Sequence, residues 1–190
     1  MALMKGIRTI GIDPGHGDRD QGAVGNGLVE KDLNMRLAAE LFSVGLKYGF
    51  NMQLLRPGDL GMSLEDRVKL ANWLEVDVFL SVHHNGDESA ETTGTETFYF
   101  PGSEAGESLA RSVQERMIDG LGLADRGIKW GGGFYVLRET EMPAVLIKPL
   151  FVTNWVDASR VENEWYFSEL AMSILGGLVG ADCVGWDGRF

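Results

Sequence analysis

The stretch from Val76 to Val82 constrains the fold of this 190-residue chain most, because its residues are nearly all apolar. A strand of that kind is buried on both faces, which is typical of parallel sheets covered by helices. After Glu30, by contrast, apolar residues recur at helical spacing, at positions 33, 37, 41 and 44. Strand-like and helix-like segments alternate in this way along the chain, and the alternation predicts an α/β domain.

The expected elements follow one another in a simple order. We expect strands at residues 6–12, 50–55, 76–82, 95–100, 134–137 and 144–147. We expect helices at residues 30–49, from Ser63 onward, after Ser103 and at 165–179. The prediction is a single α/β domain with a mostly parallel, twisted sheet flanked by helices on both faces. We expect this domain to span residues 1–180, and residues 181–190 to be a tail or the start of a linker.

Composition and charge exclude several classes of partner. The net charge of −11 and the absence of any run of Lys or Arg argue against nucleic-acid binding. The longest apolar runs are too short to span a bilayer, so we expect no membrane-spanning segment. The first five residues lead straight into a strand-like run, so no secretory signal segment is visible. We expect a monomer.

Three residues have the types and the surroundings of a metal site: His16, Glu30 and His83. Catalytic zinc commonly has three protein ligands and a water, and two histidines with one glutamate fit that set. His16 follows the first expected strand and His83 ends the central one, while Lys148 ends the strand at 144–147. Ligands of open α/β sheets bind beyond the carboxyl ends of the strands. These strand ends can therefore share one cleft.

Each of these residues also has an ordinary structural explanation. A lone histidine is more often hydrogen-bonded structurally, and a glutamate at a helix start is usually a solvated capping residue. Asp13 can orient His16 from behind, but an aspartate before proline is also an ordinary turn residue. His83 and His84 are neighbours, and neighbouring side chains of an extended chain point to opposite faces. Spacing alone does not decide which of the two faces the metal.

Six motifs in register carry a resemblance to a known family. They are Ile-Asp-Pro-Gly-His-Gly around His16, Glu-Lys at Glu30, Ser-Val-His-His-Asn around His83, Gly-Thr-Glu-Thr-Phe at 94–98, Asp-Arg-Gly-Ile-Lys at 125–129, and the segment 136–146 with its Met-Pro-Ala-Val-Leu ending. Together, from about Ile7 to Asn154, they resemble the zinc-dependent N-acetylmuramoyl-L-alanine amidases of bacterial autolysins and phage endolysins. The resemblance implies that His16, Glu30 and His83, rather than His84, bind Zn²⁺. It also implies hydrolysis of the amide between N-acetylmuramic acid and L-alanine in peptidoglycan.

The chain departs from this family at Lys148, where the resemblance places a general-base glutamate. An ammonium group cannot accept a proton, although burial and a neighbouring cation can lower the pKa of a lysine toward the range of a base. Glu96 is the best substitute carboxylate, with Glu139 and Glu141 behind it. Three explanations remain open: an amidase that uses another base, a binding module that has lost catalysis, or an inactivating substitution in an active enzyme.

The remaining expectations concern substrate and location. Arg138 is a candidate for holding a substrate carboxylate through a bidentate fork, and a structural ion pair is an equally good explanation. Asn85 is a second candidate for substrate binding. The expected partner is bacterial peptidoglycan, and the rival function is a catalytically silent peptidoglycan-binding module that keeps its zinc. The expected setting is the bacterial cell wall, reached either as a phage endolysin or as an autolysin whose signal is absent here.

Overall fold

A computed structural model describes residues 7–180 of the chain. Its main sheet has six strands in the order β4-β1-β5-β8-β6-β7. Their bounds are β1 Thr9–Pro14, β4 Asn51–Leu54, β5 Val78–Val82, β6 Thr95–Tyr99, β7 Asp125–Trp130 and β8 Ala144–Lys148. Four neighbouring pairs are parallel and only β6 and β8 are antiparallel. The predicted α/β class with a mostly parallel sheet is confirmed.

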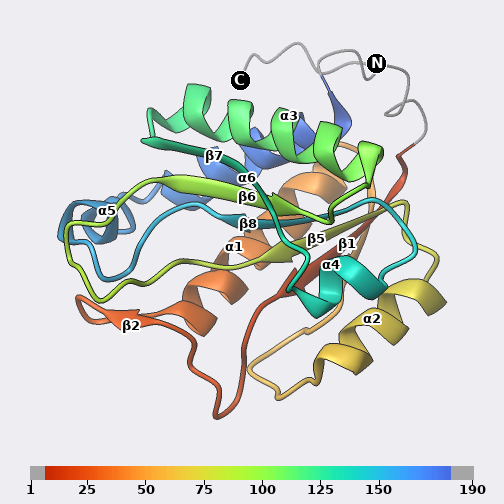
Figure 1. Cartoon of the computed structure of the whole chain (residues 1–190), viewed down its shortest axis with the longest axis horizontal. Coiled ribbons are helices and arrows are strands. Elements are labelled where there is room, and N and C mark those ends of the chain that lie inside the picture. Colours follow the sequence, from red (N-terminus) through yellow and green to blue (C-terminus); the bar gives the residue numbers. More distant parts are fainter. Residues whose placement is uncertain (1–6, 181–190) are drawn as a thin grey trace.

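Helices cover both faces of this sheet, as predicted. Three long helices lie on one face: α1 Glu30–Lys47, α3 Glu104–Leu121 and α6 Tyr166–Val179. Two shorter helices lie on the other: α2 Leu64–Trp73 and α4 Tyr135–Glu139. Figure 1 shows α3 running alongside β7 and β6. Short helix α5 Trp155–Arg160 and the two-stranded hairpin of β2 Val24–Gly25 and β3 Leu28–Val29 complete the fold.

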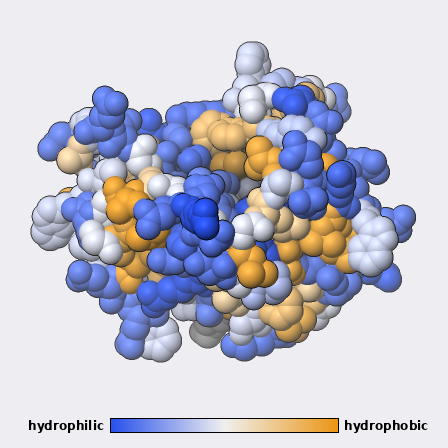
Figure 2. Space-filling view, turned by 90° about the horizontal axis from the view of Figure 1, so that it is seen from below, coloured by the Kyte–Doolittle hydropathy of each residue, from blue (hydrophilic) through white to orange (hydrophobic). Residues whose placement is uncertain are grey.

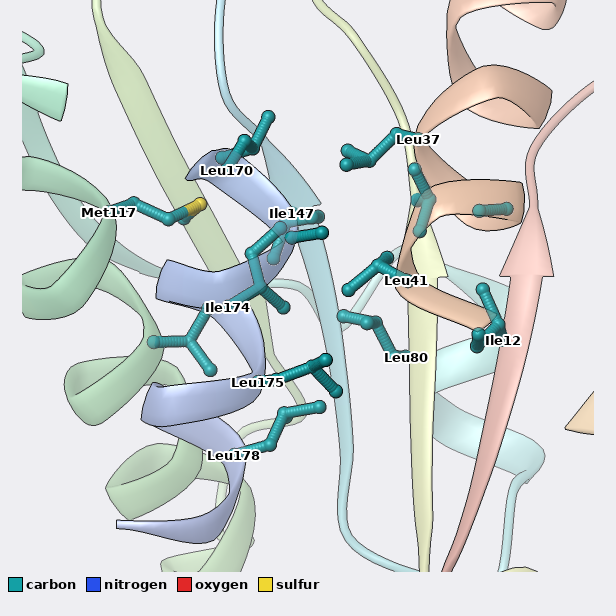
Figure 3. Close-up of a cluster of buried hydrophobic side chains, with 14 of the residues drawn as sticks. Ile12, Leu37, Leu41, Leu80, Met117, Ile147, Leu170, Ile174, Leu175 and Leu178 are labelled. Atoms are coloured by element: carbon teal, nitrogen blue, oxygen red, sulfur yellow. The ribbon is translucent and has the colours of Figure 1, made fainter. Parts of the chain in front are cut away.

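Strand β5 lies at the centre of the sheet, between β1 and β8, and all five of its residues are buried. Alternate side chains point to opposite faces, so Leu80 packs toward the long helices and Phe79 toward the short ones. Figure 3 shows Leu80 and Ile147 of the sheet between Leu41 of α1 and Ile174 of α6. The continuous apolar pattern of this segment thus reflects two separate cores, one on each face.

Local signals explain where several helices begin. The Ser63 hydroxyl accepts a hydrogen bond from the backbone N–H of Asp66 at 3.1 Å, which caps α2 as expected. Ser103 caps α3 in the same way through the N–H of Gly106 at 3.0 Å. Each bond satisfies an N–H group that has no partner inside the helix.

The expected strand at residues 134–137 is wrong, because this segment enters the helix α4. Short apolar runs of this length fit a buried helical turn as well as a strand. Three further elements were not expected: β7, α5 and the β2–β3 hairpin. β7 carries charged, partly exposed residues because it is an edge strand, so it lacks the apolar pattern of the central strands.

The helices cover the two faces of the sheet to different extents. On the face of α2 and α4, the core includes Phe79 of β5 and Ala144 and Leu146 of β8, with Phe98 near the end of the antiparallel strand β6 packed against them. The last position of β8 on that face, Lys148, is only partly buried. The short helices therefore leave the sheet open at the end where β1, β5 and β8 finish.

The surface carries several separate apolar areas. Large exposed apolar side chains occur on different elements: Leu60, Leu64, Trp73, Trp130, Trp155, Val156 and Trp165. Figure 2 shows hydrophobic areas separated by hydrophilic ones on the face seen from below the view of Figure 1. No helix within residues 7–180 is both long enough and apolar enough to cross a membrane. The expected tail at 181–190 lies outside the described residues, so the domain boundary stays a prediction.

Candidate metal site

The structure brings His16, Glu30 and His83 together, with one ligand atom of each lying within 4.8 Å of the others. His16 Nε2 is 3.1 Å from Glu30 Oε1, and His83 Nδ1 is 2.9 Å from the same oxygen. The two imidazole rings meet edge to face, with centroids 4.9 Å apart. Three donors that converge on one small volume are the set and the spacing that zinc uses. The donor chemistry of the site therefore fits a zinc ion.

At two positions around the site, the chain is so close to the candidate ligands that only glycine fits. A Cβ atom on Gly15 would lie 2.2 Å from the His83 ring. A Cβ on Gly22 would lie 2.5 Å from Glu30 Oε2 and 2.6 Å from the His16 ring, and Gly22 also has a positive φ of 66°. These glycines let the chain pass directly against the three candidate ligands.

Glu30 occupies the first turn of α1, where backbone groups hold both of its oxygens. Oε2 accepts a hydrogen bond from the N–H of Ala23 at 2.8 Å, and Oε1 accepts one from the N–H of His84 at 3.1 Å. Burial alone raises the pKa of this carboxyl, but the bonds from His16, His83 and Ala23 outweigh it and lower the pKa far below the ordinary value. The glutamate is held as an anion facing both histidines.

Residue His16 lies in a left-handed stretch of backbone, with a φ of 62°. Two buried arginines hold this stretch. Arg67 donates to the carbonyls of Pro14 at 2.7 Å and His16 at 2.8 Å. Arg56 donates to the carbonyls of Pro14 at 3.1 Å and Gly15 at 3.3 Å. The arginines stabilise a conformation that a residue other than glycine rarely adopts.

The partner that orients His16 is Asp20 rather than Asp13. The His16 Nδ1 lies 2.8 Å from Asp20 Oδ2, which leaves Nε2 for the site. Asp13 instead lies buried in β1, pairs with Arg67 and accepts a bond from Ser81 at 3.0 Å, so it neither orients His16 nor serves as a turn residue. Burial lowers the pKa of His16, but Glu30 and Asp20 raise it more, and the pKa lies above its ordinary value.

His83 and His84 point to opposite faces, as their neighbouring positions predict. Burial lowers the pKa of His83 despite the bond to Glu30. The His84 ring faces away from the site, with Nδ1 2.8 Å from Asn34 Oδ1, and burial lowers its pKa to about 3. The structure therefore groups His83, and not His84, with the other two candidate ligands.

Lys148 lies next to the site on the open face of the sheet. Its predecessor Ile147 pairs with Val82, so Lys148 and His83 are neighbours on adjacent strands. Its ammonium group donates to the carbonyl of His84 at 3.3 Å. Burial lowers the pKa of Lys148, while the charges of Glu30 and Glu96 oppose that shift in part.

Glu96 faces Lys148 directly across the antiparallel pair β6–β8. It accepts hydrogen bonds from Asn85 at 2.7 Å and Arg126 at 2.9 Å, and it also forms an ion pair with Lys129. Burial raises the pKa of Glu96, but these three donors outweigh that effect and lower it. The side chain is a carboxylate already occupied by three partners.

The two candidates for substrate binding lie in different places. Asn85 follows the two histidines and donates to Glu96, so it lies beside the candidate metal site. Arg138 lies in α4, which precedes the first residue of β8, whereas Lys148 is its last residue. Arg138 is therefore at the other end of the sheet, where it pairs with Glu139 at 2.7 Å and lies over the Tyr135 ring. The ion-pair explanation describes its contacts.

Several residues of the site were not found from the sequence. Asp20, Arg56 and Arg67 support the His16 loop, and Arg126 and Lys129 bind Glu96. One sequence feature could have indicated the role of Asp20, namely its spacing of four residues from His16. The contacts of Arg67 with residues 13–16 cross more than fifty positions of sequence, and no local pattern reports them.

Several known proteins are similar to this chain in sequence or in fold. LytC, an N-acetylmuramoyl-L-alanine amidase of Bacillus subtilis, is 40% identical over 173 residues, which are 90% of this chain but 35% of LytC. The endolysin of Bacillus phage SPP1 is 31% identical over 171 residues, covering 86% of this chain and 62% of the endolysin. A crystal structure of an N-acetylmuramoyl-L-alanine amidase from Clostridium difficile superposes with a TM-score of 0.87 at 36% identity, over 90% of this chain and 95% of that one.

This chain thus spans about a third of the length of LytC. The family model described as N-acetylmuramoyl-L-alanine amidase matches residues 10–179, which include all three candidate ligands and Lys148. On this match, the chain belongs to the N-acetylmuramoyl-L-alanine amidase family.

Proposed function

We propose that this domain hydrolyses the amide between N-acetylmuramic acid and L-alanine in bacterial peptidoglycan, with zinc held by His16, Glu30 and His83. The observation that carries the proposal is the convergence of these three ligand atoms at the open end of the sheet. Zinc in such a site lowers the pKa of a water molecule toward about 7 and polarises the scissile carbonyl. The names of the relatives support the choice of substrate.

Hydrogen bonds within the domain hold the candidate ligands in place without substrate. The N–H groups of Ala23 and His84 fix the Glu30 carboxylate, and Asp20 fixes the ring of His16. His16 and His83 are partly exposed, so the site can be reached from outside the domain. A site with fixed ligands loses little free energy to reorganisation when it binds its metal and substrate.

Lys148 is expected to slow turnover. It occupies the position that the resemblance gives to the general-base glutamate, and its ammonium form has no lone pair to accept a proton. Glu96 is the nearest substitute, but a base needs a free oxygen, and Glu96 is engaged by Asn85, Arg126 and Lys129. We propose that proton transfer in this domain relies on solvent or on a minor neutral form of Lys148, and is inefficient.

The presence of Lys148 at the general-base position also favours a second candidate function, a zinc-containing module that binds peptidoglycan without cleaving it. Such a module would keep the metal for structure and would retain the cleft. Analysis of digested peptidoglycan separates the two functions. New free amino groups of L-alanine support the amidase, and retention on walls without release of these groups supports the module.

Exchange of Lys148 tests the role of this position directly. Lys148→Glu should raise the rate of amide hydrolysis by about 10²–10⁴-fold, the usual contribution of general acid–base catalysis. Lys47→Glu makes the same change of charge on the exposed last turn of α1, about 25 Å along the helix from Glu30, and should leave the rate unchanged. A Lys148→Glu protein that binds zinc but is no faster would contradict the assignment.

The proposed setting is the bacterial cell wall. LytC and the endolysin of phage SPP1 are the relatives that support it. Peptidoglycan is the proposed partner of the domain. The monomeric state and the lack of nucleic-acid binding stay predictions from the sequence.

A further inference from the structure

Three cationic side chains gather on the open face beside the candidate metal site: Arg126, Lys129 and Lys148, here called the cationic group. They come from two strands, β7 and β8, on either side of β6. Glu96 of β6 lies between them and forms ion pairs with Arg126 and Lys129. Lys148 is its partner across the strand pair. One carboxylate therefore faces three positive charges.

Three other acids near this part of the sheet have partners of their own. Asp125 Oδ1 accepts bonds from Gln114 at 2.6 Å and Gly127 at 2.8 Å, on the side of α3. Asp157 accepts bonds from Thr93, Gly94 and Phe151. Glu30 faces the two histidines, where a zinc ion would more than offset its charge. Among direct charge contacts, the cationic group thus has three positive charges to the one negative charge of Glu96, in a chain of net charge −11.

The cationic group also has hydrogen-bonding capacity left over. Within residues 7–180, each lysine ammonium makes one hydrogen bond, Lys129 to Glu96 and Lys148 to the carbonyl of His84. An ammonium group has three donors, so two remain on each lysine. Arg126 uses Nε for Glu96 and Nη1 for the carbonyl of Thr93, and its guanidinium lies over the Phe151 ring. The Arg126 and Lys129 side chains are 35% and 36% exposed, so a ligand can reach them.

The position of the group relative to the metal site fixes which part of a substrate would meet it. Lys148 is one strand from His83, and β7 is three strands from β5, at about 5 Å per strand. A ligand bound there would lie about 5–15 Å from the reacting amide, which is the reach of one to four extended residues. In a muramoyl-alanine amide, the sugar side carries no free carboxylate. The amine side is L-alanine, whose carboxyl is free or continues into a peptide.

We propose that Lys148, Lys129 and Arg126 form a carboxylate-binding subsite that recognises an anionic peptide on the amine side of the scissile amide. The inference rests on the proposed function, because it assumes that a muramoyl peptide enters this cleft. It gives Lys148 a binding role in a position where it cannot serve as an efficient base. Charge-assisted hydrogen bonds from two lysines and one arginine hold the carboxylate.

Binding measurements on the zinc-loaded protein with the amine-side product, which has no scissile amide, test this subsite without turnover. The probes, titrated by calorimetry, are the amine-side peptide L-alanyl-glycyl-glycine, whose free carboxylate reaches about 10 Å from its amino end, and the carboxamide of the same peptide. The acid should bind about fivefold to tenfold more tightly than the amide, and the difference should shrink as salt is added. Lys129→Met and Lys148→Met should each remove most of this preference. Lys47→Met, a loss of the same charge far from the cleft, should keep it.

Each outcome bears on the subsite separately from hydrolysis. Equal affinity for acid and amide, or a preference that survives both lysine substitutions, would overturn the proposal. Competition by glycerol 3-phosphate as strong as that by the acid would also overturn it, because the group would then select anions in general. A preference for the acid in a protein that releases no L-alanine amino groups would support the subsite and contradict the proposed amidase activity.

Discussion

Replacing Arg67 should destabilise the domain more than any other single exchange of a charged residue near the site. Its side chain is 4% exposed and that of Asp13 only 1%, so the pair is buried on both sides. Arg67→Met leaves the Asp13 carboxylate with Ser81 as its remaining side-chain partner among the described residues. It also removes the donors to the carbonyls of Pro14 and His16.

The expected cost is about 3–5 kcal/mol, the range for breaking a buried ion pair from one side. The whole free energy of unfolding of a folded domain is about 5–15 kcal/mol, so the variant should unfold at a much lower urea concentration than the unchanged protein. The assay is urea unfolding of the metal-free protein, followed by tryptophan fluorescence. Because Arg67 holds the backbone of His16, the variant should also bind zinc more weakly after refolding.

Two controls separate this explanation from a general loss of charge. The ion pair of Arg111 and Glu107 on α3 is exposed, with 58% and 45% of the side chains accessible, and Arg111→Met should cost at most about 0.5 kcal/mol. Adding Asp13→Asn to Arg67→Met removes the unpaired carboxylate and should restore about 1–3 kcal/mol. A cost below about 1 kcal/mol for Arg67→Met, or a double variant no more stable than the single one, would refute the reasoning.

Three further exchanges test the site and the core. Asp20→Ala should weaken zinc binding about 10–100-fold, because the His16 ring loses the carboxylate that orients it; unchanged affinity in a zinc competition titration would argue against that role. Gly22→Ala should weaken zinc binding at least tenfold, since its Cβ would collide with Glu30 and His16. Gly27→Ala has a similar positive φ and open space around it, so it should bind zinc normally, and equal effects would indicate backbone strain alone. Leu80→Ala in β5 should cost about 2–5 kcal/mol in urea unfolding, and a much smaller cost would mean that the core closes around the missing side chain.

The sequence predicted the central part of the fold because burial leaves a strong pattern there. The residues of β5 are apolar on both faces, and α1 has apolar positions at helical spacing. Both patterns follow from contact with the two cores. The edge strand β7 and the short helix α4 leave no such pattern, because one is partly exposed and the other is barely longer than a turn. The antiparallel direction of β6 was likewise not visible from local residues.

The candidate ligands were predictable for a different reason. His16 and His83 follow strands whose carboxyl ends meet, so sheet topology alone brings them into one region. The choice between His83 and His84 needed the family resemblance, and the position of the side chains agrees with it. Asp20, Arg67 and the cationic group depend on contacts between distant segments. The position of Arg138 could not be predicted, because the order of motifs along the chain does not tell at which end of the sheet a helix lies.

The order of strands has a consequence for motion. Hydrogen exchange should be slowest in β5, which is buried on both faces and paired on both edges, and faster in β7, whose outer edge is unpaired within the six-stranded sheet. Rigidity should therefore decrease along the line from His83 through Lys148 and Glu96 to Lys129. The candidate ligand His83 directly follows the strand expected to be least mobile, and the proposed peptide contacts extend onto one expected to be more mobile. Substitutions in β7 can then alter which peptides are accepted while the metal geometry stays unchanged.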